Sequence, residues 1–502
     1  GLFGGSDEEL LSAFEVPELY RSRPEVRDGL AYYVRLNASP SAVTPPQPAV
    51  PWRGRTPAKL YMPWNGFLRM TNVLELINPS TVPVSVIVTL FDINGSAAGE
   101  GRTVVVPASG QFDVIVNDLP GFAADSYGIV TLDFDGTIKG RLSVYRSSSE
   151  AGQFDFAYAV PFSEPLTAAT SIPFNTFHPA QNGQQTSVSN WLSIVNLDTN
   201  DAKEFSVRRF GEDGTLLFTQ EVSVPAFGRL DLDGGHGIPG LNRIGLNEIV
   251  PHTSDTKYLA FLVRYGGEIR NPDKFAFAFP LLGRSGSQAD EYLPLSNGGG
   301  GQNWVELTNA SEQSITAQLT FYDTSGATIF GPISYVLNGH SQLHLNASMI
   351  LGPALSGSLK LSSSLAGALM AHSMFYFYQN SGEISAMYGV PSKLQLTASG
   401  SGSYNLFLGM NNWLRLANVS DTSVNTTVTL TGLNGVISQK VYFLAPHAQI
   451  ELPLHEGNTF NTSPDSYGLL KVEGTGLASE ILRIKPAPLG NGFDFAFPTE
   501  IN

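Results

Sequence analysis

Cysteine is absent from this chain of 502 residues. Disulfides, thiolate-ligated metals and thiol nucleophiles are therefore excluded. The chain is also poor in basic residues and rich in glycine, serine, threonine and asparagine, a composition more typical of secreted or surface proteins than of cytosolic enzymes. We therefore expect an extracellular or cell-surface protein, most consistent with a bacterial source.

Charge is scarce as well. Charged residues make up 15% of the chain, against about 25% in typical soluble domains. The formal net charge of −15 argues against a nucleic-acid partner and against adhesion to anionic lipid, since both require basic patches. A surface with so few charges is either hydrated through hydroxyls and amides or hidden against neighbours in a packed assembly, and the sequence leaves both open.

Long apolar runs are missing too. No segment approaches 18 unbroken apolar residues, so we expect no membrane insertion through a helix. No signal peptide is visible, and the chain begins with Gly1 rather than methionine, which suggests a processed form. Glycine and proline are frequent but lack a triplet period, which excludes collagen.

What the sequence does contain is a seven-residue segment, bounded by asparagines, that occurs four times at steps of roughly 110 residues. The copies run from Asn72 to Asn78, Asn190 to Asn196, Asn303 to Asn309 and Asn412 to Asn418, and the last three place Trp191, Trp304 and Trp413 after the first asparagine. We interpret these residues as structural: the asparagines suit strand ends, where short amides bond to loop backbone. The tryptophan either caps the edge of its unit or packs against the next one.

Other features follow in the same order in each copy. A turn signal such as Phe91-Asp-Ile-Asn-Gly95 predicts a hairpin with a type I′ turn. An alternating strand such as Val106-Pro-Ala-Ser-Gly110 comes next, and each copy closes on an aromatic strand followed by a proline. The aromatic strands are interpreted as core strands first and sugar-stacking platforms second. The order of features predicts four copies of one unit.

The unit is predicted to be a β-sandwich, because Val84, Val86 and Val88 alternate with more polar neighbours and about 100 residues suffice for one sandwich. The predicted fold is all-β, with four tandem antiparallel β-sandwich domains at residues 59–165, 166–285, 286–395 and 396–502. The second has a glycine-rich loop insertion at 233–257. Units of this size hold their own cores, so we expect beads on a string that form a rod.

Residues 1–58 do not match the unit. A capping box at Ser6 predicts a short helix, Gly29 to Leu36 predicts a lone strand, and residues 38–57 are typical of an extended linker. The predicted strand either folds back onto the first sandwich or completes a sheet in a neighbouring molecule.

Searches for chemistry predict no catalytic, cofactor or metal-binding residues. The Gly-x-Ser-x-Gly elbow of serine hydrolases is absent. His340 and His344 lie four apart, but on strand-like sequence they would not share a helical face as metal ligands do. Acidic clusters such as Asp133-Phe-Asp-Gly136 leave calcium as an alternative without the full ligand spacing of a calcium loop.

The Asn-Trp-Leu strand, the Phe-Asp-x-Asn-Gly hairpin, Val-Pro-Ala-x-Gly and Ser-Tyr-Gly together resemble the tandem immunoglobulin-like repeats of bacterial secreted and cell-surface proteins. The resemblance covers about residues 59–502 and is to a style of repeat rather than to one family. It implies a structural or adhesive role outside the cell and transfers no site residues.

These observations predict a non-enzymatic extracellular structural protein, a homo-oligomeric or polymeric subunit of a fibre, sheath or surface layer, joined through its N-terminal arm. The alternative is a cell-surface adhesin that binds glycans through loop ends or exposed aromatics. A distant alternative is a carbohydrate-active enzyme with an acidic pair near residues 233–257.

Overall fold

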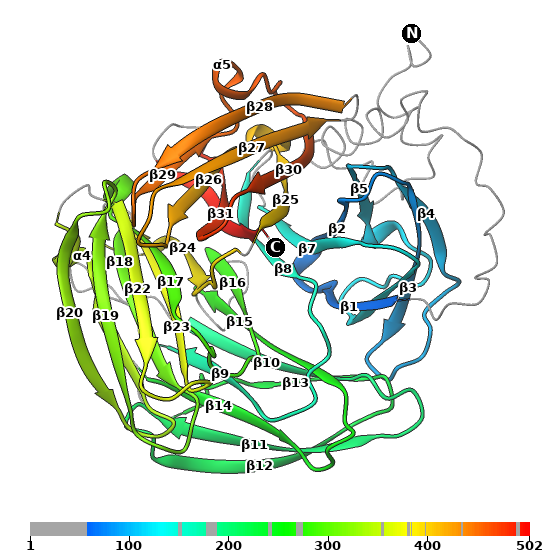
Figure 1. Ribbon diagram of the computed structural model, residues 1–502. Helices are drawn as coiled ribbons and strands as arrows, with labels where there is room; N and C mark the ends of the chain where they lie inside the picture. Colours follow the sequence, from blue (N-terminus) through cyan, green and yellow to red (C-terminus); the bar gives the residue numbers. More distant parts are fainter. Residues whose placement is uncertain are drawn as a thin grey trace, which may run out of the picture.

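The computed structural model is all-β, and its strands form eight four-stranded antiparallel sheets (Figure 1). It describes residues 58–148, 153–176, 188–238, 243–267, 275–352, 356–378, 382, 384–396, 398–432, 435–487 and 492–501. Residues 1–57 of the predicted N-terminal arm lie outside these ranges, and Ala58 begins the first strand. None of the helices in the described ranges has the length and apolar character needed to cross a bilayer.

Eight consecutive strands make up each of four repeats, numbered 1 to 4 along the chain. Repeat 1 contains β1 (Ala58–Asn65), β2 (Met70–Asn78), β3 (Val84–Asp92), β4 (Arg102–Val106), β5 (Gly110–Ile115), β6 (Tyr127–Phe134), β7 (Lys139–Ser147) and β8 (Phe154–Pro161). Repeat 2 contains β9 (Thr170–Asn175), β10 (Val188–Asn196), β11 (Lys203–Gly211), β12 (Leu216–Val224), β13 (Arg229–Asp233), β14 (Ile244–Pro251), β15 (Tyr258–Gly266) and β16 (Phe277–Leu282).

The second half of the chain repeats this order. Repeat 3 contains β17 (Glu291–Ser296), β18 (Gln302–Asn309), β19 (Ile315–Asp323), β20 (Thr328–Leu337), β21 (Gln342–Asn346), β22 (Ser356–Ser363), β23 (Leu369–Tyr378) and β24 (Ile384–Pro391). Repeat 4 contains β25 (Ser399–Asn405), β26 (Asn411–Asn418), β27 (Val424–Gly432), β28 (Gly435–Leu444), β29 (Gln449–Pro453), β30 (Tyr467–Glu473), β31 (Leu477–Pro486) and β32 (Phe493–Glu500). Short helices intervene: η1 (Phe67–Arg69), η2 (Val116–Asp118), η4 (Gly298–Gly300), α4 (Ala347–Leu351), η5 (Phe407–Gly409) and α5 (Gly457–Phe460).

Strand order is the same in all four repeats. In repeat 1 the outer sheet has the order β1-β6-β3-β4 and the inner sheet the order β5-β2-β7-β8, and the other repeats match strand for strand. Only β3–β4 and β7–β8 are hairpins within one sheet, so the other connections cross between the sheets. Four copies of a topology this specific follow from the sequence repeat.

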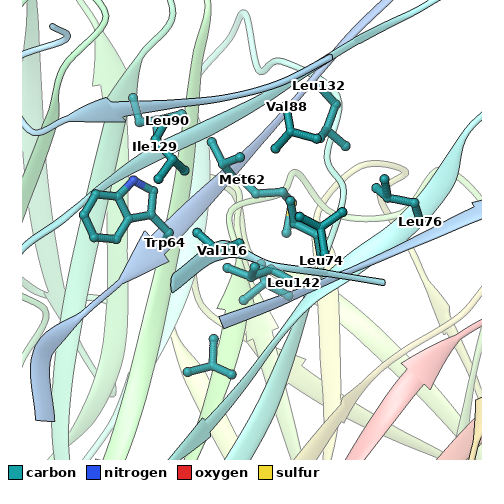
Figure 2. Close-up of a cluster of buried hydrophobic side chains, with 14 of the residues drawn as sticks. Met62, Trp64, Leu74, Leu76, Val88, Leu90, Val116, Ile129, Leu132 and Leu142 are labelled. Carbon is teal, nitrogen blue, oxygen red and sulfur yellow. The ribbon is translucent and has the colours of Figure 1, made fainter. Parts of the chain in front are cut away.

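A hydrophobic core lies between the two sheets of each repeat. Figure 2 shows this in repeat 1, where Met62 and Trp64 of β1 and Val88 and Leu90 of β3 meet Leu74 of β2. The alternation predicted for Val84, Val86 and Val88 is confirmed, because all three are buried on the same side of β3. Each repeat is therefore a two-sheet sandwich; the proposed domain boundaries and the immunoglobulin-like assignment stay predictions.

The first three hairpins between the third and fourth strands are built differently from the prediction. A type I′ turn needs positive φ at two central residues, but in the first hairpin only Gly95 has a positive φ, 82°. The Asp92 carboxylate accepts bonds from the amides of Asn94 and Ser96, both at 2.9 Å, and this cap holds the turn with a single left-handed residue. The type I′ prediction is wrong for this reason.

The prediction of a loop insertion at residues 233–257 of repeat 2 is also wrong. Ile244–Pro251 within it is strand β14, the counterpart of β6, β22 and β30. Its alternation is broken by Gly245 and Asn247, both at buried positions, so the period-two pattern was too weak to reveal it.

The four repeats do not form the expected rod but close into a ring (Figure 1). The last strand of each repeat lies at the axis, where β8 packs against β16 and β32, and β24 packs against the same two strands. Repeat 4 therefore contacts repeat 1. We call the contact between two neighbouring repeats a seam, so the ring has seams 1/2, 2/3, 3/4 and 4/1.

Candidate functional site: the four seams and the axial cavity

The first asparagine of each motif joins the two sheets of its own repeat. Asn72 of β2 accepts a bond from the Asn65 amide at 3.0 Å and donates to the Asn65 carbonyl at 2.7 Å, at the end of β1. The counterparts Asn190 and Asn412 make the same two bonds, to Asn175 and Asn405. Asn303 accepts from the Ser296 amide at 3.2 Å and donates to β23 instead.

The second asparagine fastens the opposite end of the same strand. In repeat 3, Asn309 Nδ2 donates to the carbonyls of Gln313, Leu337 and Asn338 at 2.7–3.2 Å, and so holds the end of β20. Equivalent bonds to the end of the fourth strand are made by Asn78, Asn196 and Asn418. All eight asparagines are at most 1% exposed. The motif therefore clamps the central inner strand to both edge strands of the outer sheet.

The three tryptophans differ in their surroundings. Trp304 packs into a cluster shared with repeat 2, and Trp413 into a cluster shared with repeat 3. Trp191 is 41% exposed, and its ring lies 4.9 Å from that of His236. Two tryptophans thus fill seams, and the third remains at the surface.

The fourth position of the motif is where the repeats meet. It is occupied by Glu75, Ser193, Glu306 and Arg415, all at most 7% exposed. Leu74 and Leu76 face the core of repeat 1, so Glu75 points to the other side of the inner sheet, toward repeat 4. The polar face of the inner sheet is therefore buried against a neighbouring repeat and is not exposed to water.

Seam 4/1 holds a buried ion pair. Arg483 of β31 donates from Nη1 to Glu75 Oε1 at 2.6 Å and from Nη2 to Oε2 at 2.8 Å, and both side chains are fully buried. Ser143 and Ser403 donate to the same carboxylate at 2.7 and 3.2 Å. Burial alone would raise the pKa of Glu75, but Arg483 and Arg141 lower it to about 2.

Seam 2/3 repeats this arrangement. Arg264 of β15 donates to both oxygens of Glu306 at 2.9 and 3.0 Å, and Asn175 donates at 2.7 Å. Burial opposes ionisation, yet Arg264 and His344 lower the pKa of Glu306 to about 2. Arg264 and Arg483 lie at the same position, opposite the first asparagine of their own repeats.

The other two seams use arginine differently. In seam 1/2, Arg229 donates to the Trp64 and Gly128 carbonyls of repeat 1 at 2.9 and 3.3 Å while Asp231 of its own repeat holds its other nitrogens. In seam 3/4, Arg415 contacts Tyr388 Oη at 3.5 Å. Seams 2/3 and 4/1, which contain a buried glutamate–arginine pair, thus alternate around the ring with seams 1/2 and 3/4, in which an arginine contacts uncharged oxygen atoms of the neighbouring repeat.

Three seams contain a second contact, and we call the part of a seam where it lies the rim. There the hairpin between the third and fourth strands of one repeat meets the turn before the fifth strand of the next. A hairpin carbonyl accepts a backbone bond in each case: Ile93 O from Arg229 N at 2.9 Å, Glu212 O from Gln342 N at 2.9 Å, and Thr324 O from Gln449 N at 3.0 Å. Two rings meet beside it: Phe91 and Phe227 at 4.6 Å, Phe210 and His340 at 4.1 Å, and Tyr322 and His447 at 4.3 Å. His340 is therefore a turn residue in a seam.

At the axis, residues of all four repeats line a cavity of about 170 Å³. Pro161, Pro280, Pro391 and Pro498 all contribute, and these are the prolines that follow the aromatic strands. Proline lacks the amide donor of a strand ladder, which suits four edge strands that pack by side chains without merging into one sheet.

The charged residues of the cavity wall already have partners. Arg284 bonds to Glu291 at 3.2 Å and to Ser392 Oγ at 2.9 Å, and Lys393 lies 3.8 Å from Glu480. Burial and the charge of Arg284 lower the pKa of His372 to about 3, so this imidazole is neutral at physiological pH. The arrangement holds the repeats together, and its cations are neutralised by the protein itself.

No group of three or more His, Asp or Glu side chains is placed to hold a metal among the residues that the structure describes. His344 Nε2 lies 3.7 Å from Glu306 Oε1, inside seam 2/3, and His340 stacks at its rim. Calcium stays a prediction.

Sequence reasoning placed the eight asparagines and three tryptophans in a structural motif but missed the seam residues. A signal was present: repeats 1 and 3 carry glutamate at the fourth motif position, and repeats 2 and 4 carry arginine opposite the first asparagine. Complementary charges that alternate between repeats indicate pairing between repeats.

No family model matches the chain, and no curated protein matches it. Fifteen chains of solved structures match. A tetra-tandem repeat from the extending region of a large adhesion protein is 12% identical over 88% of this chain and 99% of its own, with a TM-score of 0.09. A glycoside hydrolase of family 32 from Bifidobacterium adolescentis is 10% identical over 83% and 99%, with a TM-score of 0.13.

An infectious bursal disease virus structure, Gt strain, is 10% identical over 86% of this chain and 81% of its own, with a TM-score of 0.09. Scores this low carry no argument about fold or function. The functional conclusion therefore rests on the geometry of this chain alone.

Proposed function

We propose that this protein is an extracellular structural subunit whose ring of repeats associates with further copies through the exposed edge strands of the outer sheets. The observation that supports it is the state of β12, β20 and β28, each an edge strand of 9 or 10 residues. Large apolar side chains on these strands are exposed to solvent. Val336 is 72% exposed, Val441 66% and Phe443 68%.

Natural proteins usually protect such edges with charges, because an open edge pairs readily with another chain. β20 has no charged residue, and β28 has only Lys440. Edge strands that are long, apolar and nearly uncharged favour association between copies, and the scarcity of charge in the whole chain agrees with a surface that is covered in use.

The test compares the wild-type chain with a V441K/F443K variant by sedimentation velocity and negative-stain electron microscopy over a range of concentrations. The matched control, N458K/S463K, adds the same charge at exposed positions of the same repeat. We expect ordered assemblies of the wild type and the control, and dispersed rings of V441K/F443K. A wild-type chain that stays monomeric at every concentration contradicts the proposal.

Glycan binding is the second candidate function, and one region favours it. Trp191 presents an exposed ring that packs against the largely buried ring of His236, and an exposed aromatic face of this kind stacks on apolar sugar faces. Ile238 and Arg243 line an open groove of about 830 Å³ at the rim of seam 2/3. A W191A variant that loses binding on a glycan array bound by the wild type would support this function, and a wild type that binds no glycan would contradict it.

A further inference from the structure

Seam 4/1 differs from the other three in how the chain connects it. Short connections join β8 to β9, β16 to β17 and β24 to β25, so seams 1/2, 2/3 and 3/4 lie between consecutive repeats. Seam 4/1 lies between the last repeat and the first. Non-covalent contacts alone keep it closed, so it can open without separating consecutive repeats.

The rim of this seam also lacks the ring contact of the other three. Thr431 and Ser109 occupy the positions of the two stacked rings. A Cβ added to Gly95, Gly214 or Gly326 would overlap a carbonyl of the next repeat, whereas a Cβ on Gly435 would meet no atom within 4 Å. The hairpin of repeat 4 is therefore not packed at Gly435 as the other three hairpins are.

Repeat 1 nevertheless keeps the turn conformation that, in the other three seams, contacts the hairpin of the preceding repeat. Ser109 has a φ of 47°, close to the 50°, 55° and 57° of its counterparts Phe227, His340 and His447. The inner part of the seam is fully formed, with the Glu75–Arg483 pair and an apolar cluster that includes Tyr145, Phe495 and Phe497. The two faces are thus complementary and specific. Among the described residues they meet near the axis and where β30 of repeat 4 contacts β5 of repeat 1, but without the pair of rings found in the other three seams.

We propose that seam 4/1 opens and re-forms between copies, so that repeat 4 of one chain docks on repeat 1 of the next. This inference rests on the proposed assembly function and names the face that joins copies end to end. Faces of two different kinds make a heterologous contact, which gives closed rings when it is satisfied within one chain and open filaments when it is not. Because the internal contact benefits from an effective concentration on the order of millimolar, the closed ring dominates in dilute solution and exchange grows with concentration.

A charge-swap experiment tests the exchange. E75R places an arginine beside Arg483 and Arg141, and R483E places a glutamate beside Glu75, so neither chain can form the ion pair within itself. A mixture can form it between chains at both junctions. In a V441K/F443K background, which removes edge-strand association, we expect mass photometry to show dimers and larger species in the mixture, and none in either chain alone.

The E75R/R483E double variant is the control, because it restores the pair within one chain and should behave like the wild type. A folded double variant together with a mixture that stays monomeric would overturn the proposal.

A second pair of substitutions avoids buried like charges and so does not depend on the stability of the single variants. T431Y/S109H introduces at seam 4/1 the residues that stack in seam 3/4. We expect this variant to close the rim and to reduce assembly of the otherwise wild-type chain at least tenfold.

Assembly that is unchanged by T431Y/S109H, with no complementation between E75R and R483E, refutes the exchange but leaves edge-strand association intact. A wild type that never assembles, although the two swapped chains complement each other, refutes the proposed function and leaves the exchange intact.

Discussion

Glu75 and Arg483 lie 408 residues apart in the chain and form a two-bond ion pair that is fully buried. Glu306 and Arg264 form the same pair in seam 2/3. Each glutamate belongs to the repeated asparagine motif, and each arginine to the repeat before it in the ring. The repeated motif therefore specifies both the interior of a repeat and its contact with a neighbour.

Removal of one partner of a buried pair should be far more harmful than removal of both. We expect R264M to lower the free energy of unfolding by about 3–5 kcal/mol, because it leaves the Glu306 carboxylate buried without its cation. The R264M/E306L double variant should lose much less. Urea unfolding of both variants provides the measurement.

The control for this prediction is K471A, which removes an exposed pair with a 2.6 Å distance to Glu473. We expect it to change the free energy of unfolding by less than about 1 kcal/mol. An R264M effect as small as that of K471A would show that the buried pair contributes little to the ring.

Stability should fall in mild acid because of His372. Its folded pKa of about 3 lies below the usual 6.5, so between these values the unfolded chain binds the extra proton. The contribution is complete above pH 6.5 and is lost as pH falls toward 3. Glu75 and Glu306, with pKa values of about 2 against 4.5, add to the loss below pH 4.5.

The measurement is the urea unfolding free energy at pH 8, 6 and 4 for the wild type and for H372Q. Arg284, Glu306 and Arg264 surround this histidine and remain in the variant. We expect a shallower decline between pH 6.5 and 4 in H372Q. Equal pH profiles would assign the decline to other groups.

The second motif asparagine should contribute strongly to stability. N309A leaves the carbonyls of Gln313, Leu337 and Asn338 without their donor. At about 1 kcal/mol for each bond, we expect a loss of about 2–3 kcal/mol in the free energy of unfolding. The exposed Asn425 of β27 gives a control, N425A, which should be nearly neutral. Similar losses in both variants would refute the clamp.

The rim contact can be tested with two glycines of positive φ. Gly326 has a φ of 89° and Gly435 a φ of 106°, so alanine is strained at both positions. Only G326A also forces a Cβ into the Pro446 carbonyl across seam 3/4. We expect G326A to lower the thermal unfolding midpoint more than G435A. Equal midpoints would mean that the hairpin does not press on the next repeat.

The repeat itself could be predicted from the sequence, because the asparagine motif and the alternation of strands act within one unit. Val84, Val86 and Val88 were predicted to alternate with more polar neighbours, and all three are buried. Strand β14 was missed because Gly245 and Asn247 interrupt its apolar pattern. Local patterns give reliable information where a residue's partners are close in the chain.

The ring could not be predicted in the same way. Alternation shows that one face of a strand is buried, but it does not say whether the other face meets water or a neighbouring repeat. Glu306 shares its face with Trp304 and is buried by repeat 2. The partners of the aromatic strands lie in other repeats, so burial between units was indistinguishable from burial within one.

The central position of the last strand has a consequence for synthesis. At about 5–20 residues per second, the 408 residues that separate Glu75 from Arg483 take roughly 20–80 s to translate. During that time the apolar flank of β8 has no β32 to cover it, although repeat 1 is already complete. A chain that stops before β32 would therefore leave this flank of β8 uncovered.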